Sequence, residues 1–139
     1  MSNVLEEKDA IRELIARYCF LIDDAQYDEW AQTFDENAVF EVRGMFKFEG
    51  RSAIREFANH IPKNAQGKPG MKHCTLNQII EVSGERAKAT CYLLLIRDGT
   101  PLQVDIAGRY EDELVKRGGR WLFSQRVAHF DYRAVGQVT

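Results

Sequence analysis

Two polar residues in apolar surroundings carry the chemistry that this sequence suggests most directly. Asp23 follows Leu21 and Ile22 at the end of an apolar stretch, and His73 lies in the segment 71–75. A carboxylate that hydrogen-bonds an imidazole fixes the tautomer of the ring and raises its basicity, which makes the pair a proton-transfer device. We therefore expect the fold to bring Asp23 and His73 to one pocket.

Both residues also have ordinary structural explanations. Asp23 and its neighbour Asp24 could end a helix in a polar turn, and His73 could be a core or edge histidine whose ring is satisfied. Two successive aspartates, however, allow one carboxylate to face a pocket while the other faces solvent.

Arg126 and Tyr18 are the next candidates. Strand alternation predicts Arg126 on the same side as Leu122, Ser124 and Ala128. An arginine on such a face needs an anionic partner or substrate, unless it forms a salt bridge at the surface. Tyr18 lies on an apolar helical stripe, where its ring could simply pack in the core or its hydroxyl could face a ligand.

Other chemistries have weaker support in the sequence. His73, His129 and a carboxylate could form a two-histidine, one-carboxylate metal site, but no H-E-x-x-H spacing supports one. No Gly-x-Ser-x-Gly elbow and no Gly-Lys-Ser/Thr phosphate loop occurs. We therefore expect neither a metal nor another cofactor.

Three cysteines, Cys19, Cys74 and Cys91, lie far apart and show no C-x-x-C spacing. We interpret them as buried reduced thiols that pack as small hydrophobic side chains. Cys74 is an alternative nucleophile because it follows His73, although neighbours on a strand point to opposite faces.

Composition limits the classes of protein that remain. The chain has 139 residues, of which 45% are hydrophobic, so we expect one domain over residues 1–139 with a sizeable core. A formal net charge of -2 gives no electrostatic case for nucleic acid. No apolar run approaches the roughly 20 residues of a membrane span, and the N-terminal residues do not resemble a signal peptide. The expected location is the cytoplasm.

Helical segments dominate the first half of the chain. Apolar residues at helical spacing predict a helix over 5–22, through Ile11, Leu14, Ile15, Tyr18 and Ile22. A short helix is expected from about Tyr27 to Phe34, a hairpin over 38–43 and 46–48, and a helix over 53–61. The segment 62–70 is rich in Pro, Gly, Asn and Lys, which predicts a loop.

The second half predicts four long strands, over 71–82, 86–97, 102–115 and 120–131. Short Gly-containing connections make neighbouring strands antiparallel hairpins. The expected fold is therefore α+β: three helices, all before these strands, pack on one face of a curved, cone-shaped antiparallel or mixed sheet. Both faces of 71–82 are largely apolar, which predicts a homo-oligomer, dimer or trimer, through the uncovered sheet face.

These elements and their motifs resemble the SnoaL-like branch of the nuclear-transport-factor-2-like superfamily, which has a cystatin-like fold. The carriers are residues 10–18, Asp23, and the segments 27–30, 48–54, 72–77, 108–114 and 119–123. That branch includes dehydratases and a dehydrochlorinase, with ketosteroid isomerase and the small subunits of ring-hydroxylating dioxygenases more distant. Asp105 is the nearest candidate for the second acid of the ketosteroid isomerase pattern.

The resemblance implies specific roles. His73 would act as the base and Asp23 would orient it, while Arg126 would match a pocket arginine. Tyr18 and Tyr110 would match a catalytic tyrosine and a pocket aromatic residue of family members.

One position departs from the pattern of the dehydratases. Val42 stands where they place a substrate-polarising tyrosine, so that Arg126, Tyr18 or a water would have to replace its hydroxyl. Val42 is expected to line the substrate site together with Phe40, Trp30 and Tyr110.

The implied activity is a cofactor-independent lyase or isomerase that acts on a small, largely apolar substrate, with cyclic compounds among the candidates, by β-elimination or proton shift. The alternative is a non-catalytic ligand-binding protein or an accessory protein similar to a dioxygenase small subunit.

Overall fold

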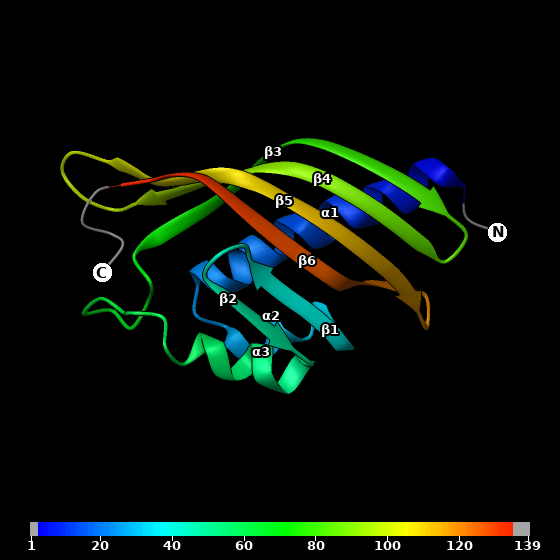
Figure 1. Cartoon of the computed structure of the whole chain (residues 1–139), viewed down its shortest axis with the longest axis horizontal. Coiled ribbons are helices and arrows are strands. Elements are labelled where there is room, and N and C mark those ends of the chain that lie inside the picture. Colours follow the sequence, from blue (N-terminus) through cyan, green and yellow to red (C-terminus); the bar gives the residue numbers. More distant parts are fainter. Residues whose placement is uncertain (1–2, 135–139) are drawn as a thin grey trace.

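The computed structural model describes residues 3–134, in which helices come first and long strands follow (Figure 1). The elements are α1 (Val4–Asp23), α2 (Tyr27–Ala31), β1 (Phe34–Val42), β2 (Phe46–Glu49), α3 (Arg51–Ala58), β3 (Met71–Ser83), β4 (Arg86–Arg97), β5 (Gln103–Arg117) and β6 (Arg120–Arg133).

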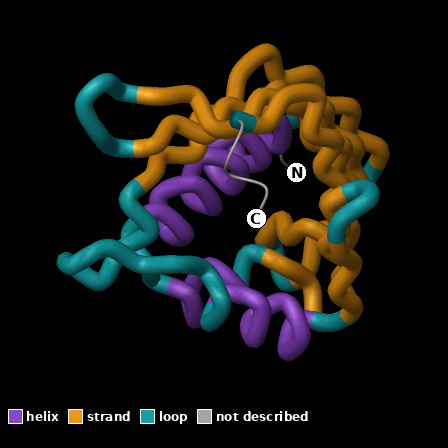
Figure 2. Tube along the Cα trace, turned by 60° about the vertical axis from the view of Figure 1, so that its left-hand side comes forward, coloured by secondary structure: helices purple, strands orange, loops and turns teal. Residues whose placement is uncertain are grey.

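The strands form one six-stranded sheet in the order β2-β1-β6-β5-β4-β3. All neighbours are antiparallel except β1 and β6, which run parallel. The sheet is therefore mixed, and it curves around the helices on its concave side (Figures 1 and 2). The predicted α+β class is confirmed.

Helix α1 forms where the sequence predicts an amphipathic stripe. The Asn3 side chain caps its start by accepting a hydrogen bond from the Glu6 backbone N–H at 2.9 Å. Its buried face packs against the concave side of the sheet and consists of Ile11, Leu14, Ile15, Tyr18, Cys19 and Ile22. Tyr18 is thus held in the core at only 1% exposure.

The C-terminal end of α1 is fixed by its own backbone. Ala25 takes a left-handed conformation with φ of 59°, and the Gln26 N–H bonds the Leu21 carbonyl at 2.9 Å. This turn ends the helix directly after Asp23 and sends the chain into α2.

The second helix is shorter than the sequence predicts, and its expected end at Phe34 is wrong. Helix α2 ends at Ala31, and Phe34 instead begins β1. The Thr33 hydroxyl donates to the Trp30 carbonyl at 2.6 Å and so satisfies a helix-terminal acceptor. Trp30 and Phe34 still meet, with ring centroids 5.4 Å apart.

Strand pairing contains irregularities that curve the sheet. The β5–β6 register shifts by one residue between Glu113 and Leu114 and again between Ala107 and Gly108. A Cβ atom at Gly108 would lie 2.2 Å from the His129 carbonyl oxygen, so only glycine allows this approach. These shifts decide which side chains of β6 face the helices.

No helix among residues 3–134 has the length and apolar character needed to cross a membrane.

Candidate active site

His73 and Asp23 meet at the edge of the sheet. The Nδ1 atom of His73 lies 2.7 Å from Asp23 Oδ1, and the His73 backbone N–H donates to Asp23 Oδ2 at 3.0 Å. Both side chains are about 15% exposed, at 14% and 15% respectively. Because a carboxylate only accepts hydrogen bonds, Nδ1 carries the proton and Nε2 is the basic nitrogen of the neutral ring.

The local structure explains why an aspartate occupies this position. A carboxylate in the last turn of a helix is disfavoured by the helix dipole, and α1 has no basic residue there. Strand β3 forms the edge of the sheet, so the backbone N–H of His73 needs a partner outside the ladder. Asp23 supplies this partner and also accepts from the His73 ring, and the two hydrogen bonds offset its unfavourable position at the helix end. Asp24, in contrast, faces Lys68 at 3.7 Å with half of its side chain exposed.

His73 lines an apolar cavity of about 190 Å³ between the helices and the concave side of the sheet. The other lining residues are Tyr18, Ile22, Phe40, Val42, Phe46, Phe57, Ile61, Pro69, Met71, Leu93, Leu95, Tyr110, Ala128 and Phe130. Of these described residues, only His73, Tyr18 and Tyr110 carry a polar nitrogen or oxygen on the side chain. None carries a permanent charge.

Tyr18 and Tyr110 lie next to each other in the cavity wall. Their ring centroids lie 6.2 Å apart, and each side chain influences the pKa of the other. The ring of Tyr18 also contacts that of His73, at 6.4 Å between centroids. Burial raises the pKa of Tyr18 to about 12, so its hydroxyl is protonated at neutral pH and can donate.

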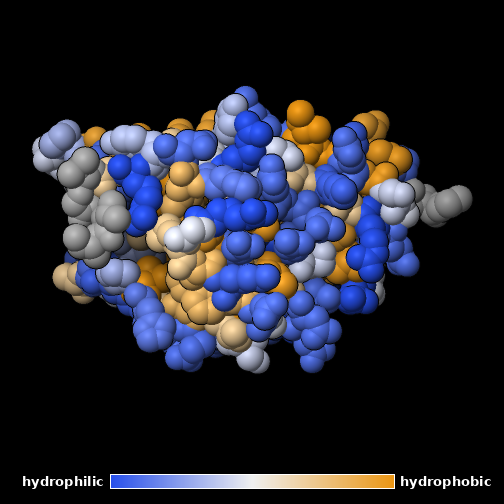
Figure 3. Space-filling model, in the orientation of Figure 1, coloured by the Kyte–Doolittle hydropathy of each residue, from blue (hydrophilic) through white to orange (hydrophobic). Residues whose placement is uncertain are grey.

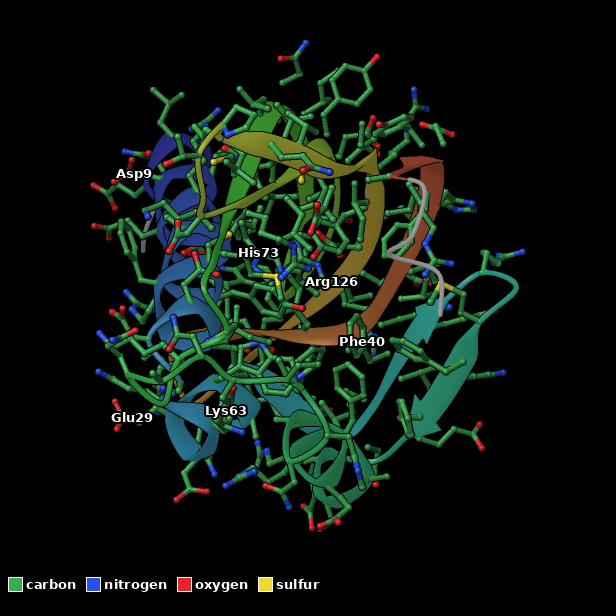
Figure 4. All side chains as sticks on the ribbon, turned by 90° about the vertical axis from the view of Figure 1, so that its left-hand side faces the viewer. Asp9, Glu29, Phe40, Lys63, His73 and Arg126 are labelled. Carbon is green, nitrogen blue, oxygen red and sulfur yellow. The ribbon has the colours of Figure 1, made fainter. Side chains whose placement is uncertain are left out.

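Arg126 does not line the cavity. Its side chain is fully buried behind the two tyrosines, where its Nε and Nη2 atoms donate to Asp112 at 2.9 and 3.2 Å. The predicted position beside Leu122 and Ser124 is wrong, because the register shift in β6 turns Arg126 toward Phe123. Figure 4 shows Arg126 and His73 in the interior between α1 and the sheet.

Asp112 and Arg126 are both charged at neutral pH. Burial raises the pKa of Asp112 to about 6, against the opposing attraction of Arg126. Desolvation disfavours the charged form of Arg126, but Asp112 and the surrounding groups together raise its pKa above the ordinary value. The pair is therefore an ion pair that compensates its own burial.

Comparison with known proteins places this architecture in a family. The model of the SnoaL-like domain matches residues 3–127. The chain belongs to the SnoaL-like family.

Among known relatives of this SnoaL-like chain is the hydroxylase subunit beta of methanesulfonate monooxygenase from Methylosulfonomonas methylovora. The two are 23% identical over 90% of this chain and 81% of that protein. A candidate scytalone dehydratase from Novosphingobium aromaticivorans has a similar structure, with a TM-score of 0.79 and 26% identity over 97% of each chain. An NTF2-like protein with a cystatin-like fold from the same organism gives a TM-score of 0.81 at 21% identity, over 95% of this chain and 86% of that one.

Not all of the residues predicted to bind the substrate line the cavity. Phe40, Val42 and Tyr110 line it, as the sequence predicts. Trp30 does not; its side chain is fully buried behind the wall, with its ring centroid 6.2 Å from that of Phe40.

The histidine and acid of the alternative sites lie elsewhere. His129 contacts Glu111 at 3.3 Å and does not join His73. Within residues 3–134, no three side chains of the metal-ligating types come together. Asp105 is buried and forms an ion pair with Arg97.

Two cysteines pack in the core, as the sequence predicts, and Cys74 is partly exposed. Burial raises the pKa of Cys19 to about 12 and that of Cys91 to about 11, so both are thiols at neutral pH.

Asp112, the partner of Arg126, is the residue of this region that sequence reasoning missed. It stands between Glu111 and Glu113, where three successive acids suggest an exposed strand. The available signal is alternation, because Tyr110, Asp112 and Leu114 share one side of β5 and two of them are large and apolar.

Proposed function

We propose that this protein is a cofactor-independent lyase or isomerase that acts on a small, neutral, largely apolar molecule in the cavity. The observation that carries the proposal is the hydrogen bond from His73 Nδ1 to Asp23, because His73 also lines this cavity. A neutral imidazole oriented in this way has its basic Nε2 atom available for a substrate. Family membership and the likeness to a candidate scytalone dehydratase support the same reaction class.

The proposed first step is removal of a proton from a carbon next to a carbonyl group. His73 Nε2 takes the proton, and the electron pair of the C–H bond passes toward the carbonyl oxygen as an enolate. Asp23 stabilises the imidazolium that forms. In β-elimination the enolate pair then forms the C=C bond while the bond to the leaving group breaks. The leaving group departs with the electron pair of the bond that breaks and receives the proton from His73; in isomerisation His73 returns the proton to another carbon.

Tyr18 and Tyr110 supply the hydroxyls that the dehydratase position at Val42 lacks. Both line the cavity, and burial keeps Tyr18 protonated. We propose that this pair donates a hydrogen bond to the developing enolate oxygen, a contribution worth roughly 10²–10³ in rate when such a donor is removed.

The lining also limits the substrate class. Among the described residues that line the cavity there is no lysine, arginine, aspartate or glutamate, so a charged substrate would be desolvated without a partner in this lining. A cavity of about 190 Å³ is below the roughly 300–1,000 Å³ of ordinary ligand sites. A compact neutral ketone fits both constraints.

The proposal is tested with a panel of neutral cyclic β-hydroxyketones, in which elimination produces an enone that absorbs in the ultraviolet. Wild-type protein is expected to accelerate enone formation, and His73→Gln is expected to lower the rate by roughly 10²–10⁴, the usual contribution of a general base. His60→Gln is the matched control, because the His60 side chain is exposed, faces Glu56 at 3.8 Å and does not line the cavity. Equal activity in His73→Gln and wild type would overturn the mechanism.

A second candidate is a non-catalytic role as an accessory subunit of an oxygenase. The match to the methanesulfonate monooxygenase hydroxylase subunit beta favours it. The two functions differ in a simple respect: the lyase turns over substrate alone, whereas an accessory subunit forms a stable complex with a large hydroxylase subunit and has no activity that depends on His73. Size-exclusion chromatography of this chain co-expressed with a large hydroxylase subunit decides between the two functions, because only an accessory subunit elutes in a complex with it.

We also propose that the protein self-associates through the convex sheet face. Leu76, Ile79 and Tyr92 of β3 and β4 are 41%, 68% and 44% exposed. In Figure 3 hydrophobic surface appears along the upper margin, above β3 and β4 in Figure 1. Ile79→Asp is expected to shift sedimentation toward the monomer, whereas Phe20→Asp, on the exposed side of α1, is expected to leave the oligomer intact.

A further inference from the structure

We propose that Arg126 is a positioning residue that acts through the two cavity tyrosines. Held by Asp112 behind the wall, its guanidinium makes the Tyr18–Tyr110 pair a stronger hydrogen-bond donor toward negative charge that forms in the cavity. The inference rests on the proposed function for the origin of that charge, but the influence of Arg126 on the tyrosines is measurable without any substrate.

The guanidinium lies against the aromatic rings. Its central carbon is 3.5 Å from the ring centroid of Tyr110 and 4.3 Å from that of Tyr18. Phe123 completes this enclosure at 4.4 Å. Because the side chain of Arg126 has no solvent exposure, water does not screen its interaction with these rings.

The ion pair with Asp112 leaves an uneven field around Arg126. Asp112 accepts from Nε and Nη2, while Nη1 makes no hydrogen bond to a described oxygen or nitrogen. The tyrosine rings lie directly against the cation, so attraction from Arg126 exceeds repulsion from Asp112 at Tyr18. The same order appears among the influences on the Tyr18 pKa, where Arg126 lowers it more than Asp112 raises it.

The two hydroxyls can donate to a ligand. Each carries one proton, and both belong to residues of the cavity wall. Where one hydroxyl donates to the other, the second proton is still available to a ligand oxygen. A cation behind the rings makes this proton more acidic, and charge-assisted hydrogen bonds are the stronger ones.

The surroundings of Tyr18 contain few other groups that could titrate or carry charge. Tyr110 and Asp112 face it from β5, Arg126 from β6 and His73 from β3, and Cys19 adjoins it on α1. Burial is the largest influence on the Tyr18 pKa and raises it, and Arg126 is the largest opposing one. Arg126 is therefore the group whose removal should be visible in the ionisation of Tyr18.

The test uses a fluorinated tyrosine as a reporter. Tyr18 is replaced by 2,3,5-trifluorotyrosine, whose phenol is acidic enough to titrate before alkaline unfolding, and its ¹⁹F chemical shift is followed against pH. Removing the ion pair with the double variant Arg126→Met and Asp112→Leu is expected to raise the titration midpoint by about one pH unit. Asp112→Asn, which removes the anion and keeps the cation, is expected to lower it.

A reporter on the convex face provides the matched control. The same fluorotyrosine at Tyr92, which lies over Arg109 at 5.5 Å, is expected to titrate identically in all three backgrounds. Circular dichroism verifies that each variant is folded over the pH range used. If the double variant does not fold, the Asp112→Asn shift alone decides.

An unchanged or lowered midpoint at position 18 in the folded double variant would overturn the inference, as would an unchanged or raised midpoint in Asp112→Asn. Neither outcome bears on whether His73 removes a proton, which the His73→Gln assay decides separately.

Discussion

Replacing Asp23 with asparagine isolates the role of one carboxylate while it keeps the shape of the side chain. In the protein, the two oxygens of Asp23 accept from the ring and from the backbone N–H of His73, at 2.7 and 3.0 Å. An amide has only one oxygen. Because the backbone N–H can only donate, we expect the amide oxygen to stay with it and the amide NH₂ to face Nδ1. The ring proton then moves to Nε2, and the basic nitrogen is lost.

The geometry sets the size of the two effects. Loss of the base is expected to lower turnover by roughly 10²–10⁴. Exchange of a charge-assisted hydrogen bond for a neutral one costs about 1 kcal/mol of unfolding free energy. For a chain of this length, that loss lowers the melting temperature by about 4 °C. Activity and stability are thus expected to separate, because nearly all of the variant stays folded.

The assay combines enone formation from a β-hydroxyketone with thermal unfolding followed by circular dichroism. Asp24→Asn is the matched control: it is the same substitution one residue later, at a side chain that faces Lys68 and solvent. It is expected to keep wild-type turnover. The reasoning is refuted if Asp23→Asn keeps wild-type turnover, or if both variants lose turnover in the same measure.

Three further predictions concern stability and ligand binding. The hydrogen bond from Arg117 lowers the pKa of Asp35, so this pair stabilises the fold at pH values above the pKa that an aspartate has in the unfolded chain. The stabilisation is lost as pH falls through the pKa of Asp35 in the folded protein. In urea unfolding, Asp35→Asn should be less stable than wild type at pH 7 and equally stable in strong acid. Gly108→Ala forces the β6 backbone away and is expected to cost more than about 2 kcal/mol in the same measurement, and a cost near zero would contradict the close approach. Phe40 lines the cavity and Trp30 does not, so Phe40→Ala is expected to weaken binding of a neutral bicyclic ketone, whereas Trp30→Phe is expected to leave binding unchanged. Calorimetry measures both affinities, and equal effects would contradict this placement.

Much of the fold could be predicted because local patterns and the tertiary structure agree. The apolar stripe of α1 and the glycine turns between the long strands placed five elements within about two residues of their observed bounds. The end of α2 could not be predicted in this way. Phe34 continues a helical spacing with Trp30, and both rings are buried in one core, so spacing alone does not separate a helix from a strand there.

The candidate site was predictable where it depends on residue type and not where it depends on register. Asp23 and His73 are polar residues in apolar surroundings, which sequence shows directly. The partner of Arg126 is different, because a regular hairpin from Arg117 opposite Arg120 would place Asp112 across from Gln125. One shifted residue in β6 brings Asp112 opposite Arg126 instead, and no sequence signal marks that irregularity.

The most direct measurement of the central claim is hydrogen–deuterium exchange at carbon, because it detects proton removal without a leaving group. A neutral bicyclic ketone such as 2-tetralone, first shown by calorimetry to bind, is incubated in deuterium oxide with the protein and followed by NMR. The account predicts that wild-type protein accelerates exchange next to the carbonyl and that His73→Gln, which still binds the ketone, does not. Exchange of the bound ketone at the uncatalysed rate with wild type, or equal acceleration by His73→Gln, would contradict it.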